Sequence, residues 1–371
     1  MHVLLIERLI VMPVDMKAVM RFTKAGRLIE ATKSIQKALT ANKTTTPGEK
    51  SDERNLNASV RRSNPLGEVV GKLSELALKV ARTTKTKKPN SPLNPQFQQG
   101  SFTCAAGTRS YKIYVPKSLP QQRRTLIVML HGCSQNADDF AAGTRMNEIA
   151  ELEGLLIVYP NQTVKANSSG CWNWFNPRDQ AFGKGEPEII AGLTSEIVAK
   201  FEVDHDRVFI AGLSAGGAMA VIMGHAYPNL YSAIGVHSGL PYQSAHDVIS
   251  AFAAMRGDAK TAPSALTPRV IVFHGDADAT VHPSNAYAIA SAEKKCTAVS
   301  TINSSANGRN YKRITIENDN KLPISELWMI EGAGHAWSGG SVDGSFTDTT
   351  GPDASKEMAR FFLMQKEMDN K

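Results

Sequence analysis

The chain has 371 residues, of which 42% are hydrophobic and 21% charged, a composition typical of globular proteins with a large core. No apolar run approaches the roughly 20 residues that a membrane-spanning helix needs. The net charge of +7 comes from residues 1–100, which hold 18 Lys and Arg against 8 Asp and Glu and leave a net charge of −3 for the rest. The part after residue 100 therefore has no electrostatic preference for nucleic acid.

The first hundred residues are predicted to form a basic extension. Residues 14–42 and 67–81 place apolar side chains at helical intervals, with basic residues between them. Residues 43–65 and 83–100 are rich in Lys, Thr, Asn, Pro and Gln, as linkers are. We expect helices joined by partly disordered linkers. Because a basic amphipathic helix is a common membrane-surface device, this extension is our candidate for contact with an anionic or amphipathic surface.

The N-terminus is not recognisable as a secretion signal. Glu7 and Arg8 interrupt the apolar run of residues 1–16. No A-x-A-like cleavage site follows that run, whereas a cleaved signal has one. The sequence therefore gives no export signal that we can identify.

Residues 101–371 are predicted to form one α/β domain. Continuous apolar strands separated by helices are typical of a mostly parallel sheet with helices on both faces. A polar turn within residues 311–330 predicts an antiparallel hairpin before the last strand. The predicted strands are 111–116, 125–132, 155–160, 207–212, 233–239, 269–275 and 326–332, and the predicted helices are 138–154 (with Asp138 or Asp139 as N-cap), 188–201, the segment after Ser214, 284–295 and 353–366.

A serine, an aspartate and a histidine follow three of these strands, in that order along the chain. In RVFIAGLSAGG (residues 207–217), Ser214 stands at a strand-to-helix corner between small residues, which permit the tight turn of a nucleophile elbow. Parallel sheets place their active groups at the carboxyl ends of strands. Asp276 or Asp278 follows one later strand and His335 follows another. Ser, Asp, His is the chain order of hydrolases with such an elbow.

This order predicts a catalytic triad. A serine hydroxyl needs an imidazole to take its proton, and the imidazole needs a carboxylate to fix its tautomer. We predict Ser214 as nucleophile, His335 as base and Asp278 as the carboxylate. Asp278 is favoured because it lies three residues past Gly275, far enough beyond the strand to turn toward the histidine. Asp276 is the alternative, and is otherwise expected to hold the loop by accepting hydrogen bonds from backbone amides.

An oxyanion hole needs two backbone N–H donors. We expect one from Ala215, at the start of the helix after the nucleophile, and one from Cys133, in the LHGCSQ loop after an earlier strand. His131 in that loop is assigned to loop structure, because His335 already has the chain position of the base.

Five motifs together resemble the polyhydroxybutyrate (PHB) depolymerase family of esterases, which is related to feruloyl and acetylxylan esterases. They are HGCSQNADDF, GCWNWF, GLSAGGA, HGDADATVHP and GAGHAWSGG, and the likeness covers roughly residues 101–365. The resemblance implies an α/β-hydrolase catalytic domain over residues 101–371, after the extension of residues 1–100. It implies the same triad and oxyanion hole, short-chain hydroxyalkanoate esters as substrates, and neither a metal nor an organic cofactor.

The resemblance also bears on aromatic and cysteine residues. It implies that Trp337 lines an acyl subsite, where an indole offers a flat apolar wall. Trp172 and Trp174 either join it or pack beneath a long loop.

Cysteine spacing fits no zinc site, and four cysteines leave three pairings open. By the resemblance, Cys133 and Cys171 lie in motif loops near the site, which favours a disulfide between them in an oxidising compartment. For Cys104 and Cys296 we have no argument for pairing.

The sequence thus predicts a serine esterase that acts on an ester or polyester, PHB depolymerase-like. Feruloyl or acetylxylan esterase activity is the first alternative, and a surface-binding protein on a hydrolase scaffold is the alternative from another class. The complete triad argues against the scaffold. Family members are commonly secreted, so we expect an extracellular or periplasmic enzyme, with the cytoplasm as the alternative because no signal is recognisable. Acyl chain length and oligomeric state stay open.

Overall fold

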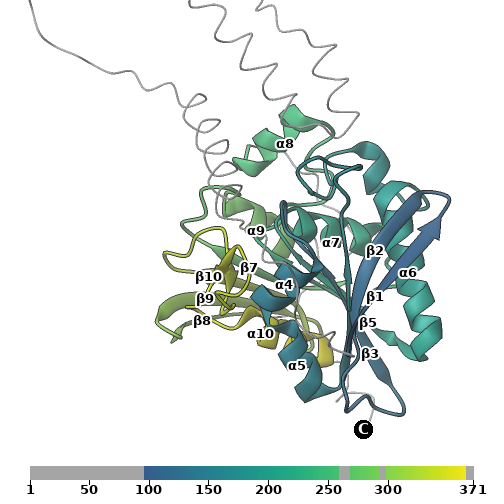
Figure 1. Ribbon diagram of the computed structural model, residues 1–371. Coiled ribbons are helices and arrows are strands. Elements are labelled where there is room, and N and C mark those ends of the chain that lie inside the picture. Colours follow the sequence, from purple (N-terminus) through teal and green to yellow (C-terminus); the bar gives the residue numbers. More distant parts are fainter. Residues whose placement is uncertain (1–95, 259–267, 292–297, 365–371) are drawn as a thin grey trace, which may run out of the picture. The chain divides into compact units, whose positions relative to one another are not determined.

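The computed structural model describes residues 96–258, 268–291 and 298–364, and the helices expected before residue 96 lie outside this part. One sheet runs through this part of the chain (Figure 1). It has ten strands in the order β1-β2-β4-β3-β5-β6-β7-β10-β9-β8. Its strands are β1 (Phe97–Cys104), β2 (Gly107–Tyr114), β3 (Arg124–Leu130), β4 (Leu155–Pro160), β5 (Val203–Leu213), β6 (Ala233–His237), β7 (Arg269–Gly275), β8 (Ala298–Ala306), β9 (Arg309–Glu317) and β10 (Pro323–Ile330). Two short strands, β11 (Trp337–Ser338) and β12 (Thr347–Asp348), pair separately.

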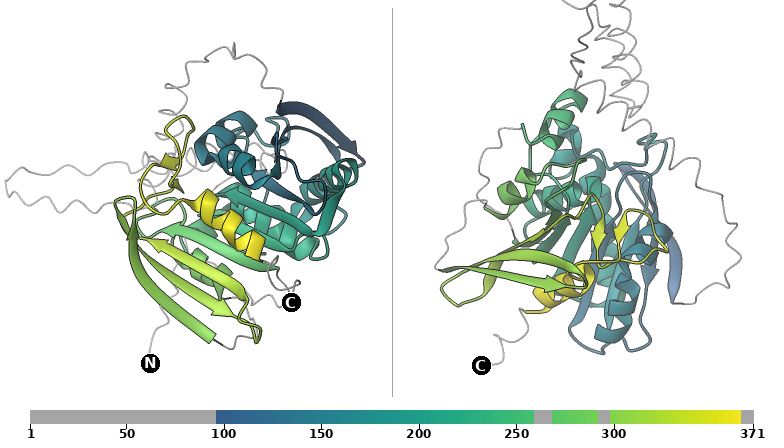
Figure 2. Two further views of the ribbon diagram at one scale, coloured as in Figure 1. Left: turned by 90° about the horizontal axis from the view of Figure 1, so that it is seen from below. Right: turned by 90° about the vertical axis from the view of Figure 1, so that its left-hand side faces the viewer.

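Helices cover both faces of the sheet (Figure 2). Side chains from α4 (Ala137–Thr144), α5 (Met146–Glu153) and α10 (Ala354–Leu363) join the hydrophobic core on one face. Those from α6 (Gly185–Phe201), α7 (Ala215–Ala226), α8 (Val248–Met255) and α9 (Ser284–Ala290) join the core on the other, and a 3-10 turn, η1 (Pro177–Gln180), precedes α6. Among the described residues, no helix is both long and apolar enough to cross a bilayer.

Strand side chains alternate between the two cores. Leu126, Val128 and Leu130 of β3 join the core beneath α6 and α7, whereas Ile127 and Met129 join the other. This alternation follows from the pleat, and burial on both faces explains why the strands read as unbroken apolar runs. The α/β-hydrolase-type fold expected from the sequence is confirmed.

The centre of the sheet is parallel and its two ends are antiparallel. Strands β4, β3, β5, β6, β7 and β10 pair in parallel. The predicted hairpin before the last strand is confirmed as β9 and β10, and β8 extends it. Because the six central strands run the same way, their carboxyl ends meet at one edge, where the predicted site residues follow them.

Two local features differ from the sequence prediction. The helix expected over residues 138–154 is two helices, because Arg145 between them adopts a left-handed backbone with φ 56°. The N-cap of α4 is Asn136 instead of Asp138 or Asp139; its side chain accepts the Asp139 amide, and both acids occupy the first turn, where they favour the helix dipole.

The second difference is at the start of the sheet. Residues 97–100, expected within a linker, begin β1, which pairs antiparallel with β2. The sequence of this strand is mostly polar and half-exposed, so it carries little apolar alternation.

Candidate active site

Ser214 occupies the corner between β5 and α7 in a strained conformation. Its φ of 57° and ψ of −119° lie outside the regions that a residue with a Cβ ordinarily adopts. Two backbone hydrogen bonds hold the corner. The Ser214 amide donates to the His237 carbonyl oxygen at 2.8 Å, and the Ala218 amide donates to the Ser214 carbonyl oxygen at 2.9 Å. Ser214 is partly exposed although residues 211–213 and 215–217 are buried. The strained corner therefore presents this one side chain.

Glycine at position 216 allows the corner to pack against the end of β3. A Cβ added there would lie 2.0 Å from the Leu130 carbonyl oxygen and 2.6 Å from that of His131. Both are backbone atoms that cannot move aside, so the sequence needs glycine here.

We expect Gly216→Ala to lower the free energy of unfolding by about 3 kcal/mol or more, because it overpacks backbone against backbone. We also expect the turnover of the folded variant to fall, because the displaced backbone of residues 130 and 131 leads into the loop of Cys133. Gly224→Ala on the same helix is the control: a Cβ there meets only side chains, at 3.1 Å or more, so we expect a change within about 1 kcal/mol. Urea unfolding measures both, and equal stabilities of the two variants would contradict the role given to Gly216.

His335 and Asp278 are in direct contact. Asp278 follows β7, His335 follows β10, and these strands are parallel neighbours. The Nδ1 of His335 lies 2.7 Å from Oδ2 of Asp278. The other carboxylate oxygen, Oδ1, accepts the amides of Thr280 at 2.8 Å and Val281 at 2.9 Å. The carboxylate is therefore fixed on both sides, and the Nδ1 nitrogen of His335 is committed to it.

The Asp278 carboxyl stays ionised despite its burial. Burial by itself raises the pKa of this group, but hydrogen bonds from His274 and His335 and from the Val281 amide outweigh it and hold the pKa well below its usual range. His274 is fully buried, with Nε2 3.4 Å from Oδ2 of Asp278 and 2.8 Å from the Val281 carbonyl oxygen. Sequence reasoning did not find this second histidine.

Asp276 has the other role that the sequence allowed. Its Oδ1 accepts the Gly332 amide at 2.7 Å, and its own amide donates to the Ile330 carbonyl at 3.1 Å. These bonds tie the loop after β7 to the loop after β10. The structure thus brings Asp278, and not Asp276, to His335.

The loop of Cys133 lies beside Ser214. A Cβ added at Gly132 would come within 3.6 Å of the Ser214 Cβ. A disulfide joins Cys133 to Cys171, as the motifs led us to expect. Ala215 is the first residue of α7, so its amide has no acceptor within the helix. The Ala215 amide thus adjoins the serine, and the loop that carries Cys133 lies beside it. Cys104 lies in β1, and Cys296 lies outside the described residues.

His131 has the structural role expected of it. The ring is buried, its Nε2 accepts the Gln162 amide at 3.0 Å, and its Nδ1 lies 2.7 Å from the Gly132 carbonyl oxygen. Burial lowers its pKa to about 4, so the ring is neutral at pH 7. His237 is also buried, and burial together with nearby His274 and His335 lowers its pKa to about 3.

These lowered values make stability depend on pH. A histidine in the unfolded chain has a pKa near 6.5, so these two buried rings cost the folded state nothing above about pH 6.5. As pH falls toward their folded pKa values, the unfolded chain takes up protons that the folded state does not, and the free energy of unfolding decreases. Between pH 7 and pH 5 we expect His237 alone to account for about 2 kcal/mol. Asp179 acts in the opposite sense, because burial raises its pKa to about 7. Its contribution to the free energy of unfolding decreases as pH rises toward 7.

The difference in unfolding free energy between pH 7 and pH 5, from urea titrations, should therefore be smaller in His237→Gln than in the wild-type protein. Taking the difference within each variant cancels the constant cost of the substitution. His205→Gln, at an exposed position, should leave the difference unchanged. An unchanged difference in His237→Gln would contradict the assignment.

All three candidate tryptophans are buried. Trp337 has no exposed surface; it stacks on His237 with ring centres 5.2 Å apart and donates from Nε1 to Ser355 Oγ at 3.1 Å. This core position corrects the expectation that Trp337 lines an acyl subsite, because a fully covered ring offers no wall to a ligand. Trp172 lies against His131, and Trp174 is 6% exposed and packs edge-on to Phe175, which matches the packing alternative.

Within residues 96–258, 268–291 and 298–364, no group of three or more His, Cys, Asp or Glu side chains is arranged to hold a metal ion. The site there consists of a strained serine at the start of α7, a histidine–aspartate pair and the neighbouring loop of Cys133.

Comparison with known proteins identifies relatives of this chain. Poly(3-hydroxyalkanoate) depolymerase C of Paucimonas lemoignei is 31% identical over 202 residues, which cover 51% of this chain and 48% of that protein. Acetylxylan esterase A of Talaromyces purpureogenus is 30% identical over 203 residues, covering 49% of this chain and 52% of the relative. The chain thus spans about half the length of the curated relatives it matches.

A solved structure and a family model complete the comparison. The acetyl xylan esterase from Aspergillus awamori shares the fold, with a TM-score of 0.54 at 22% identity, over 71% of this chain and 98% of that one. The model of the family described as esterase PHB depolymerase matches residues 109–308, more than half of the chain. The protein therefore belongs to the PHB depolymerase family of esterases.

Proposed function

We propose that this esterase hydrolyses short-chain carboxylic esters of the hydroxyalkanoate type through an acyl-enzyme on Ser214. The observation that carries the proposal is the 2.7 Å contact between His335 Nδ1 and Asp278 Oδ2. It leaves Nε2 as the nitrogen of His335 that can exchange a proton with the serine. β5, β6, β7 and β10 are successive in the sheet, so all three residues follow strands at one edge.

In this mechanism Ser214 Oγ attacks the ester carbonyl carbon while His335 Nε2 takes the hydroxyl proton. The tetrahedral intermediate places its negative oxygen on the amides of Cys133 and Ala215. As the carbon–oxygen bond to the alcohol breaks, His335 returns the proton to the leaving oxygen. Water then attacks the acyl-enzyme with the same base, which releases the acid and restores the serine. Asp278 stays ionised and stabilises the imidazolium throughout.

The choice of substrate rests on the relatives. One is named a poly(3-hydroxyalkanoate) depolymerase and another an acetylxylan esterase, so both names describe enzymes acting on esters of small acids. Burial of Trp337 removes the support for an aromatic wall in the acyl site. Acetylxylan esterase activity is the second candidate, because a relative with that name is 30% identical to this chain over 203 residues.

A panel of esters tests the proposal. Initial rates would be measured on p-nitrophenyl acetate and butyrate, a 3-hydroxybutyrate trimer, acetylated xylan and methyl ferulate, with Ser214→Ala as the blank. We expect highest kcat/KM on the hydroxybutyrate trimer. Preference for acetylated xylan or methyl ferulate would replace the substrate class while keeping the mechanism. Mass spectrometry after treatment with diisopropyl fluorophosphate should place the adduct on Ser214, and an adduct elsewhere would contradict the mechanism.

A further inference from the structure

A buried carboxylate outside the triad lies at the start of α6. Glu186 is 3% exposed, and its Oε1 accepts from Arg109 Nη2 at 3.2 Å, from Asn173 Nδ2 at 2.8 Å and from Gln162 Nε2. Its Oε2 accepts the Asn173 backbone amide at 2.7 Å. A buried charge is tolerated only when it is paired and hydrogen-bonded, and four donors meet that need here. The proposed mechanism gives this charge no role.

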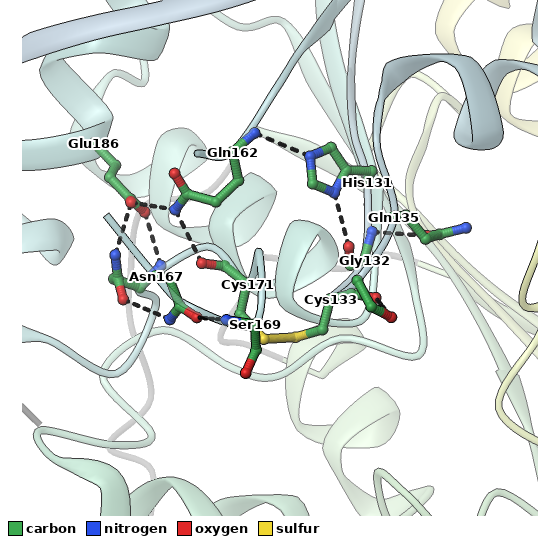
Figure 3. The surroundings of a disulfide bond; sticks show 11 residues. His131, Gly132, Cys133, Gln135, Gln162, Asn167, Ser169, Cys171 and Glu186 are labelled. Atoms are coloured by element: carbon green, nitrogen blue, oxygen red, sulfur yellow. Dashed lines mark hydrogen bonds between the residues drawn. A yellow bond between two sulfur atoms is a disulfide. The ribbon is translucent and has the colours of Figure 1, made fainter. Parts of the chain in front are cut away.

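Gln162 connects Glu186 to the loops at the active site (Figure 3). Its side-chain Nε2 donates both to Glu186 and, at 2.9 Å, to the carbonyl oxygen of Cys171. Its backbone amide donates to His131 Nε2 at 3.0 Å. The carboxylate of Glu186 thus fixes a residue that holds the disulfide-bonded Cys171 on one side and the ring of His131 on the other.

The ring of His131 sets the direction of the Cys133 amide. Because Nε2 accepts from Gln162, the proton of the neutral ring is on Nδ1, which donates to the Gly132 carbonyl oxygen at 2.7 Å. The Gly132 carbonyl and the Cys133 amide belong to one planar peptide unit. A bond that fixes the oxygen therefore also fixes the direction of the N–H. The disulfide to Cys171 restrains the same residue through its side chain.

We propose that Glu186 is a positioning residue for the oxyanion hole, acting through Gln162 and His131 on the peptide between Gly132 and Cys133. The inference rests on the proposed role of the Cys133 amide. An oxyanion hole works because its donors are aimed before the reaction begins, so a small misdirection of one N–H lowers the rate of the chemical step more than it lowers substrate binding.

Glu186→Gln tests the proposal with nearly the same volume. The donors at Oε1 require an oxygen, so the new amide nitrogen must face the Asn173 N–H, donor against donor, and the 162–173 segment must shift. We expect kcat on p-nitrophenyl butyrate to fall about 10- to 100-fold with KM within about 3-fold. Affinity for butaneboronic acid, which forms a tetrahedral adduct with the serine, should fall by the same factor. Glu196→Gln, exposed on the same helix, is the matched control.

Gln162→Met is the second variant. If Glu186→Gln does not fold, Gln162→Met alone tests whether the network positions the oxyanion hole. The substitution removes the Nε2 donor and the Oε1 acceptor of the Thr163 amide, but it leaves the Arg109–Glu186 ion pair and the hydrogen bond from the backbone amide of residue 162 to His131. We expect a loss of kcat and of boronic acid affinity in the same direction. Wild-type kcat in the folded variants, or a rise in KM at constant kcat, would overturn the proposal.

The assays separate this inference from the function on which it rests. If wild-type turnover persists in Ser214→Ala, the proposed function fails and the inference fails with it. If Ser214→Ala abolishes turnover while both network variants behave like Glu196→Gln, only the role of Glu186 fails.

Discussion

Replacing Ser214 with alanine is expected to lower kcat/KM for a short-chain ester by about 10⁵- to 10⁶-fold, the scale on which loss of a triad nucleophile acts in serine hydrolases. The change removes only an oxygen from a partly exposed position, so the unfolding free energy should stay within about 1 kcal/mol of wild type. The strain at φ 57° is retained, because alanine has the same Cβ. Stopped-flow release of p-nitrophenol, with a check for an acyl-enzyme burst, measures the effect.

Ser195→Ala is the control, because Ser195 is exposed on α6 and donates only to the Ala191 carbonyl one turn earlier. It should retain wild-type kcat/KM. Loss of less than about 10-fold in Ser214→Ala would mean that another group attacks the ester, and the elbow would then have no catalytic role.

Asp278→Asn should cost about 10³- to 10⁴-fold in kcat. Oδ1 accepts two amides, from Thr280 and Val281, so the oxygen of the new side chain must stay there. Its NH₂ group then faces His335 Nδ1, which becomes an acceptor. The imidazole proton moves to Nε2, the nitrogen that takes the serine proton in the proposed mechanism, so the histidine is in the wrong tautomer to act as base. The kcat and KM of the purified variant measure the effect.

Asp276→Asn is a closely matched comparison two residues away. Its new carbonyl can still accept the Gly332 amide, so the loop should keep its shape and kcat should change by less than about 10-fold. If the two substitutions caused equal losses, the carboxylate at 278 would have no special relation to His335.

Much of the fold was predictable from sequence because the central strands are buried on both faces. Strands such as 155–160 and 269–275 are continuous apolar runs, and the structure places β4 and β7 at these same residues. The site residues were identifiable for a related reason. Ser214 follows β5 directly, and Asp278 and His335 stand in the loops that follow β7 and β10, so the parallel sheet by itself brings them to one edge. The order of serine, aspartate and histidine then limited the chemistry that they could share.

Other features depend on contacts that no local pattern encodes. Glu186 stands in the first turn of α6, where acids are usually exposed and favour the helix dipole. Only the approach of Arg109, from β2, and of Asn173 and Gln162, from a long loop, makes it a buried anchor. The resemblance implied that Trp337 lines an acyl subsite, but motif similarity does not fix side-chain direction, and the ring is buried in the core.

The position of β10 in the sheet has a consequence for when the proposed triad is completed during folding. This late segment, residues 323–330, inserts between β7 and β9, with parallel pairing on one side and antiparallel on the other. His335 comes only after it, so a nascent chain that has emerged as far as Ser214 and Asp278 still lacks the proposed base. Non-local pairing of this kind is slow to form, because distant segments must meet before any contact stabilises them. We therefore expect the proposed esterase activity to recover late on refolding, because it requires the completed sheet and not only the collapse of its first half.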